Sequence, residues 1–310
     1  MDSPGCIVPG CRGTIMSEIK IYVVCHKLFE VPSHPYLFPI QVGASLSANR
    51  FPGMLYDDTG DSISNKNRSY CELTAQYWAW KNDAAAWQGI FHYRRYLSFD
   101  ARSQARAAGE HFGRPYRVLE RPTAQSLRRA GYDPQGLARF LEAFDVIAPV
   151  PENMGMTAAR QYETAPHHYA ADLTIVRELL RRGDPRDWRA AEEYLNGTNL
   201  YFGNLFLMRR PLFERYSAWL FDLLAKYDEQ KDVSGYSPQA QRVDGYLAER
   251  LFGVYLTRLR AEGTAVGFVP RLHFAGMESR GAYLKQRAET LLLPPGSVRR
   301  NAARRLLRKI

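Results

Sequence analysis

The sequence lacks a long apolar run, a signal-peptide pattern and the common hydrolase signatures, and each absence excludes a class of protein. No stretch of about 18 apolar residues occurs, so we expect no transmembrane helix. No lysine or arginine precedes Arg12 and no apolar core follows, so the N-terminus does not resemble a signal peptide. H-E-x-x-H and G-x-S-x-G are also absent, which argues against common zinc-protease and serine-hydrolase chemistry.

Cysteine is scarce, and its pattern suits a reducing cytoplasm. Cys25 and Cys71 fall in apolar segments and are expected to be small buried side chains. The other two cysteines lie in MDSPGCIVPGCRGTI, where no second pair completes a zinc site. We favour a disordered leader over residues 1–15, and Met16, which precedes a clean strand, could be the true start.

Positive charge is concentrated at the C-terminus. The net charge is +10, and the last twelve residues, RRNAARRLLRKI, carry six cations and no acid, which leaves only +4 for the rest. Arginines at helical spacing with leucines between them predict a basic amphipathic tail over residues 291–310. Such a tail suits the anionic inner face of the plasma membrane or is a solvated, frayed end. Because the aromatic residues fall on apolar faces rather than in a basic stripe, we expect no nucleic acid as partner.

The apolar patterns alternate between strands and helices. SEIKIYVVCHK reads as a first strand, and SYCELTAQYWAWKND as a helix in which Ser69 and Glu72 have the spacing of a capping box. AWQGIFHYRRYL follows as a second strand, and two long amphipathic helices occupy the last third. This order predicts an α/β fold with a mixed, mostly parallel sheet, forming one domain over residues 16–290 with a helical C-terminal extension.

The second strand ends in His92, Tyr93, Arg94, Arg95 and a further tyrosine. Ligands of open α/β sheets bind at the carboxyl ends of the strands, and guanidiniums suit phosphate oxygens. The tyrosines can stack on a base or a sugar, and the histidine can donate to a phosphate. Alternatively the arginines pair with local carboxylates and the histidine is a core residue. If the strand continues, neighbouring arginines point to opposite faces and only one reaches a ligand.

Three segments carry a resemblance to a known family: NKNRSYCELTAQYWAWKNDAAAWQGIFHYRRYLSF, NLYFGNLFLMRRPLFERYSAWLFDLL and RVDGYLAERLF. They resemble a bacterial family encoded in capsular, exopolysaccharide and O-antigen gene clusters, long catalogued as a domain of unknown function and now treated as glycosyltransferase-like. The resemblance covers roughly residues 18 to 260. It implies the nucleotide-sugar-binding GT-A fold, in which a D-x-D motif usually holds a divalent metal on the diphosphate.

The resemblance places HYRRY where that metal motif would stand. We therefore expect Arg94 and Arg95, helped by His92, to replace the metal in neutralising the leaving diphosphate. A metal alternative remains, because Asp57, Asp58 and Asp61 lie in one loop and could bind Mg²⁺ or Mn²⁺. The same loop also reads as ordinary turn chemistry or as a contact to sugar hydroxyls.

Further candidates flank the predicted strands and helices. Binding of the nucleotide or sugar is expected from His26, Lys27, Asn65, Asn67, Glu72, Gly203 and Asn204. Each also has a structural interpretation: a surface lysine with a backbone-bonded histidine, a helix cap, or a strand bulge.

An inverting transfer to a hydroxyl needs a general base, and the RVDGYLAER segment offers Asp244 and Glu249. They are five residues apart, so a regular helix cannot present both to one pocket. The resemblance favours Glu249, whose alternative is a structural ion pair with Arg242 or a local arginine. A retaining enzyme would need no such base. His167 and His168 diverge by about 100° on a helix and are not expected to share a metal.

The sequence thus predicts a cytoplasmic glycosyltransferase. The expected donor is a UDP-sugar, with galactose in pyranose or furanose form considered first, and the expected acceptor is a lipid-linked glycan. The rivals are a non-catalytic protein that binds nucleotide-sugars or glycans and, less favoured, a basic nucleic-acid binder.

Overall fold

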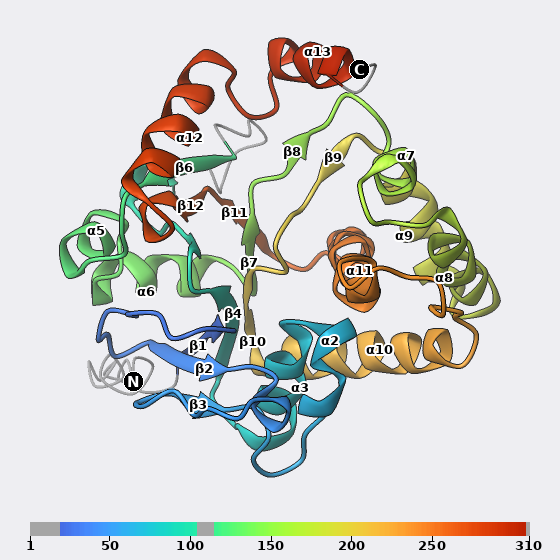
Figure 1. The fold of residues 1–310 in the computed structure, drawn as a ribbon, viewed down its shortest axis with the longest axis horizontal. Helices are drawn as coiled ribbons and strands as arrows, with labels where there is room; N and C mark the ends of the chain where they lie inside the picture. The colour runs from blue at the N-terminus through green and yellow to red at the C-terminus, as the bar shows by residue number, and fades with distance from the viewer. Residues whose placement is uncertain (1–18, 104–114, 308–310) are drawn as a thin grey trace, which may run out of the picture.

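The computed structural model describes residues 19–103 and 115–307, so the expected leader lies outside the described residues. A ten-stranded sheet forms the centre, and seven of its strands follow the order β11-β7-β10-β4-β1-β2-β3 (Figure 1). Only β10 runs antiparallel to its neighbours in this row. These strands are β1 (Ile19–Cys25), β2 (Leu37–Gln41), β3 (Leu55–Tyr56), β4 (Trp87–His92), β7 (Val146–Pro149), β10 (Phe206–Arg209) and β11 (Val266–Val269).

Helices cover both faces of the sheet, which confirms the predicted α/β class. Alternate residues of β1 face opposite cores, because successive side chains of a strand point to opposite faces. Tyr22 joins the core that contains Phe213 of α10, whereas Ile21 joins the core that contains Phe140 of α6. The helices are α2 (Asn67–Tyr70), α3 (Leu73–Asn82), α5 (Ala124–Arg129), α6 (Pro134–Ala143), α7 (Ala158–Thr164), α8 (Ala170–Arg182), α9 (Pro185–Asn196), α10 (Arg210–Asp228) and α11 (Val243–Ala261).

The predicted second strand is in fact a hairpin. β4 ends at His92, the chain turns at Tyr93 and Arg94, and β5 (Arg95–Leu97) runs back with His92 opposite Arg95. β5 then pairs with β12 (Arg271–Phe274), which pairs with β6 (Tyr116–Leu119). Arg94 and Arg95 do not both lie in one continuous strand, so they need not point to opposite faces of the sheet. Both side chains can therefore reach a ligand.

The predicted helix over residues 69–83 is interrupted at Cys71, whose φ of 51° is left-handed. α2 ends before this residue and α3 begins after it, so the predicted capping box does not form. The Ser69 hydroxyl donates to Asp244 instead, and the Glu72 side chain makes no cap hydrogen bond. Glu72 occupies the N-cap position of α3, but because its side chain makes no capping hydrogen bond, its carboxylate can face a ligand.

The helical C-terminal extension consists of α12 (Arg280–Leu292) and α13 (Val298–Leu307). α13 contacts the small sheet of β8 (Glu152–Asn153) and β9 (Asn199–Leu200), where Arg304 pairs with Glu152 at 3.2 Å. Asn301 donates to the backbone oxygen of Asn153. Four short 3-10 turns complete the fold: η1 (Ala44–Leu46), η2 (Ser64–Lys66), η3 (Ala240–Arg242) and η4 (Ala275–Met277). Within residues 19–103 and 115–307, every helix is too short or too polar to cross a membrane.

Candidate active site

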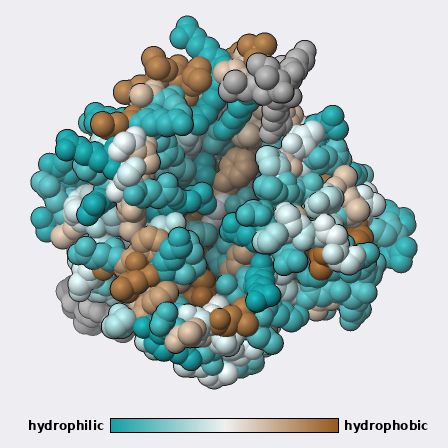
Figure 2. Space-filling view, in the orientation of Figure 1, coloured by the Kyte–Doolittle hydropathy of each residue, from teal (hydrophilic) through white to brown (hydrophobic). Residues whose placement is uncertain are grey.

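A large pocket opens at the carboxyl ends of β1 and β4, and the hollow is visible at the centre of the surface in Figure 2. Its volume is about 1060 Å³, which is enough for a nucleotide with an attached sugar. The first half of the chain contributes Val24, His26, Lys27, Val42, Asn67, Arg68, Cys71, Glu72, His92, Tyr93, Arg94 and Arg95. The second half contributes Gln161, His168, Phe202, Pro238, Gln241, Arg242, Gly245, Tyr246, Glu249, Arg250 and Glu278.

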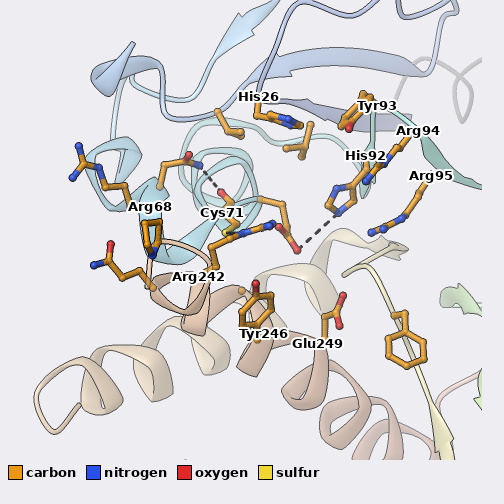
Figure 3. A pocket seen from close by; sticks show the side chains of 18 of the residues that line it. His26, Arg68, Cys71, His92, Tyr93, Arg94, Arg95, Arg242, Tyr246 and Glu249 are labelled. Carbon is orange, nitrogen blue, oxygen red and sulfur yellow. Dashed lines mark hydrogen bonds and ion pairs between the residues drawn. The ribbon is translucent and has the colours of Figure 1, made fainter. Parts of the chain in front are cut away.

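The charge of the lining is positive. Six lysine or arginine residues line the pocket against three glutamates, so an anionic ligand is favoured. Figure 3 shows Arg94 and Arg95 on the hairpin side of the pocket and Arg242 across from them, beside Cys71. The pocket therefore places guanidiniums from two distant parts of the chain around one space.

The two hairpin arginines differ in their surroundings. Arg94 forms an ion pair with Glu278, which already neutralises part of its charge. The Arg95 side chain has no hydrogen bond or ion pair among the residues that the structure describes. Across the pocket, Arg242 donates only to the Cys71 sulfur, over 3.3 Å. Lys27 and Arg68 also line the pocket without an ion pair among the described residues, so these two, Arg95 and Arg242 can all meet an anion without giving up a carboxylate partner.

His92 lies deeper in the pocket and is neutral. Burial, together with the nearby positive charge of Arg95, lowers its pKa to about 3. Its Nε2 atom is buried without a hydrogen-bond partner, 3.8 Å from Oε1 of Glu72. That contact is therefore not an ion pair. The expectation that His92 helps Arg94 and Arg95 at the diphosphate stays a prediction, because the N–H of a neutral imidazole can donate to a phosphate oxygen. A neutral imidazole can still bind a hydroxyl group.

Two neighbouring residues with left-handed backbone conformations hold two of the three pocket glutamates in place. Gly203 has φ 91° and Asn204 has φ 46°, a region that glycine and asparagine adopt most readily. The Gly203 amide donates to Oε1 of Glu249 at 2.7 Å, and Nδ2 of Asn204 donates to Oε1 of Glu72 at 2.7 Å. Both residues precede β10, so they position glutamates rather than form a bulge inside the strand.

Burial raises the pKa of Glu72, and the hydrogen bond from Asn204 opposes this effect. Glu249 stands on α11 with one-fifth of its side chain exposed, and its Oε2 lies 3.6 Å from Arg250. Glu72 and Glu249 thus supply the pocket with one buried and one partly exposed carboxyl group, and such a difference in surroundings suits different roles in acid–base chemistry.

Asp244 lies outside the pocket lining, as the helical spacing predicted for one of the two candidates. It is fully buried and pairs with Lys231 at 2.7 Å. Burial raises the pKa of Asp244, while Lys231 and the Ser69 hydroxyl lower it. These contacts give Asp244 a structural role, so its assignment as a catalytic candidate is corrected.

The aspartate loop does not form a metal cluster. Asp57 is fully buried and accepts hydrogen bonds from protein groups, and Asp58 pairs with Arg50 at 2.6 Å. Asp61 accepts from the Tyr77 hydroxyl at 3.1 Å. None of the three lines the pocket, and residues 19–103 and 115–307 contain no group of three or more potential ligands placed to hold an ion. These contacts are of the kind that the turn-chemistry alternative expects, and a Mg²⁺ or Mn²⁺ site at the three aspartates stays a prediction.

The remaining candidates divide between the pocket and the surface. His26 and Lys27 line the pocket, and the His26 ring lies 5.2 Å from that of Tyr93. Asn67 also lines it, but its Nδ2 donates to the Cys71 oxygen at 2.7 Å. Asn65 is exposed and does not line the pocket. Because α2 spans only four residues, its N-terminus is a weak anion site.

Sequence reasoning missed several lining residues. His168 stacks on Tyr246 at 4.2 Å, although the histidine doublet gave no reason to place either residue here. Arg250 is buried, bonds to Gln161, and lies 5.6 Å from the ring of Phe202. The only available signal was the Glu-Arg pair at 249–250, whose second member had no assigned role.

Comparison with known proteins gives one family and one structural relative. A family model described as a domain of unknown function (DUF4422) matches residues 20–260. No curated protein matches the chain. A solved structure, the WbbM bifunctional glycosyltransferase in its apo form, is similar with 29% identity and a TM-score of 0.76. The match covers 83% of this chain but 45% of that one, so the chain spans less than half of its relative. The similarity confirms the predicted glycosyltransferase-like α/β fold.

Proposed function

Because the chain belongs to the DUF4422 family and resembles a glycosyltransferase structure over most of its length, we propose that it is a glycosyltransferase. It moves a sugar from a nucleoside-diphosphate donor to a glycan hydroxyl. The observation that carries the proposal is that one pocket combines two kinds of group: guanidiniums without an ion pair among the described residues, such as Arg95 and Arg242, and two positioned glutamates, Glu72 and Glu249.

The guanidiniums would hold the diphosphate. Arg95 and Arg242 are available without breaking an ion pair, and Arg94 becomes available when the anion displaces Glu278. Negative charge grows on the diphosphate as its bond to the sugar breaks, and fixed cations in a partly enclosed site stabilise that charge. His26 and Tyr93 form an aromatic edge that can contact the base.

Glu249 would serve as the general base of an inverting transfer. The acceptor oxygen attacks the anomeric carbon, the bond to the diphosphate oxygen breaks with its electron pair, and the acceptor proton passes to Glu249. The Gly203 amide fixes Oε1, which leaves Oε2 to accept the proton. Glu72 and the open Nε2 of His92 would bind sugar hydroxyls. In a retaining enzyme Glu249 would instead contact the substrate without taking this proton.

The family resemblance supports UDP as the nucleotide, galactose in pyranose or furanose form as the sugar, and a lipid-linked glycan as the acceptor. These assignments imply work in the cytoplasm at the inner face of the membrane. A protein that binds nucleotide-sugars without transferring them would use the same guanidiniums, so an assay must separate binding from transfer.

A thermal-shift screen with UDP, GDP, CMP and dTDP, with and without EDTA or Mn²⁺, tests the binding step. We expect one nucleotide to stabilise the protein in the presence of EDTA. Arg95→Ala should weaken this binding by about 10-fold or more, because charge-assisted hydrogen bonds are lost. Arg128→Ala, an exposed arginine on α5, is the matched control and should bind as the wild type.

Transfer is then followed by release of the nucleoside diphosphate from the matching sugar nucleotide. Release that depends on an acceptor and is lost in Glu249→Gln supports the enzyme. Nucleotide binding without any turnover would favour the non-catalytic alternative, and no stabilisation by any nucleotide would overturn the proposal.

A further inference from the structure

Helix α12 exposes an apolar face. Leu284, Leu291 and Leu292 are 55%, 60% and 73% exposed. At 3.6 residues per turn they lie within about 100° of one another around the helix. We call these three residues the α12 leucine face. Since large leucines spaced at i, i+7 and i+8 normally pack against another element, their exposure requires an explanation.

The exposure is concentrated in this part of the molecule. Nine large hydrophobic residues are exposed within the described ranges, and five of them fall between residues 284 and 306. Val298 and Leu306 of α13 are the other two. Figure 2 shows apolar surface along the rim formed by α12 and α13. The opposite side of α12 faces the domain, where Gln286 lies 3.5 Å from His273.

The charge around this face is strongly positive. Residues 280–310 contain nine lysines and arginines and one acid, Glu289, a net charge of +8, which leaves +2 for the other 279 residues. On α12, Arg280 and Arg287 lie on one flank of the leucines and Lys285 on the other, each exposed. An apolar stripe with cations on both flanks is typical of a helix that lies in a membrane interface.

Two of the C-terminal arginines are engaged in contacts within the protein. Arg304 is turned inward and pairs with Glu152, and Arg300 donates to the backbone oxygen of Leu293. These contacts attach α13 to the domain. α12 itself therefore presents exposed leucines together with exposed cations.

We propose that the α12 leucine face and its flanking cations bind the surface of a bilayer rich in anionic lipid. Charge complementarity decides between the occupants, because a second copy of the chain would bring the same cations into contact with one another. α12 begins next to the pocket: Glu278, just before the helix, lines the main pocket, and Ala282, in its first turn, lines a smaller adjoining cavity. A membrane-bound α12 would therefore hold the pocket close to the bilayer, which suits a lipid-linked acceptor. The inference rests on the proposed function only for the reason why the protein would bind a membrane. The binding itself is argued from the leucines and cations of α12.

The test is co-sedimentation of the full-length protein with vesicles. Phosphatidylcholine vesicles are compared with vesicles of phosphatidylcholine and phosphatidylglycerol at low and high salt. We expect binding to the anionic vesicles that weakens with salt. The triple variant Leu284→Gln, Leu291→Gln, Leu292→Gln should bind the anionic vesicles about 10-fold more weakly than the wild type, or more weakly than that. Leu46→Gln, at a 49%-exposed leucine on η1, is the control and should bind like the wild type.

Two further measurements keep the outcomes distinct. Urea unfolding should show the triple variant as stable as the wild type, because the replaced side chains make few contacts; Leu291→Gln alone provides a milder variant if it does not. Light scattering without vesicles should give a monomer. Equal binding by the triple variant, no binding by the wild type, or a dimer that the triple variant abolishes would each overturn the proposal.

Nucleotide stabilisation, measured on the same proteins, separates this proposal from the proposed function. Loss of vesicle binding with nucleotide binding intact supports the docking surface. If the protein bound vesicles through the α12 leucine face but bound no nucleotide, the proposed membrane-binding surface would be supported and the proposed transferase function would be refuted.

Discussion

Replacing Asp57 tests whether the aspartate loop is structural. Its carboxylate is fully buried and accepts four hydrogen bonds. Oδ2 accepts from the Gly43 amide at 2.9 Å and from the Thr74 hydroxyl at 2.6 Å. Oδ1 accepts from the Ala44 amide at 3.0 Å and from the Ser64 hydroxyl at 2.6 Å. One side chain therefore joins η1, η2 and α3.

Asp57→Asn keeps the shape but turns one acceptor into a donor. Two of the four donors then face an N–H group, and the other two lose a charged acceptor. A hydrogen bond to a charged group contributes about 1.5–3 kcal/mol, so we expect the free energy of unfolding to fall by about 3–5 kcal/mol. At roughly 2–4 °C per kcal/mol, the midpoint of thermal unfolding should fall by about 6–20 °C.

Urea unfolding followed by circular dichroism measures the change, with Asp58→Asn as the control. Asp58 pairs with the half-exposed Arg50, so its loss should cost about 0.5 kcal/mol. A wild-type midpoint for Asp57→Asn would refute the reasoning. If that variant were stable and lost only an activity that depends on Mn²⁺, Asp57 would be a metal ligand after all.

Three further predictions follow from the pocket and its surroundings. Glu249→Gln should lower kcat by about 10²–10⁴-fold with nucleotide affinity nearly unchanged, measured by transfer assay and calorimetry, whereas loss of affinity with normal kcat would contradict a base. Asp244→Asn should instead lower the free energy of unfolding by about 3 kcal/mol, because Lys231 loses its buried partner; an unchanged urea midpoint would oppose this. His92 has a folded pKa of about 3, below its unfolded value, so its contribution to stability is complete above pH 6.5 and is lost as pH falls toward 3. The pKa of Glu72 is raised, so its contribution is present below about pH 4.5 and is lost as pH rises. Urea titrations at several pH values give the free energy of unfolding as a function of pH. For His92→Gln it should fall less steeply toward acid pH than for the wild type, and Glu72→Gln should gain stability relative to the wild type as pH rises. Parallel curves for variants and wild type would contradict both expectations.

The sheet and the position of the pocket could be predicted because apolar runs followed by polar breaks mark strand ends. β1 and β4 occur where the sequence placed strands, and the residues after them line the pocket. The reversal at Tyr93 and Arg94 could not be predicted, because neither residue is a turn former and the apolar pattern resumes at once. Pairing of β5 with β12, about 175 residues away, stabilises this turn.

The role of Glu72 in the pocket could not be predicted from neighbouring residues either, because it too depends on contacts with distant parts of the chain. Glu72 has capping-box spacing, and only the left-handed Cys71 shows that the helix starts later. The residue that holds Glu72 in place, Asn204, is 132 positions away in sequence. Contacts of this kind depend on how the chain returns to the sheet, which no sequence window contains.

The pairing of Arg94 with Glu278 has a consequence for turnover. In the proposed reaction the leaving nucleoside diphosphate carries more negative charge than the donor, so guanidiniums that recognise charge retain the product at least as well as the substrate. Glu278 is a built-in competitor for one of them, and its return to Arg94 helps to expel the spent nucleotide. The ion pair between Arg94 and Glu278 would thus influence the rate of product release. In the Glu278→Gln variant we expect faster binding of the donor and stronger inhibition by the nucleoside diphosphate product.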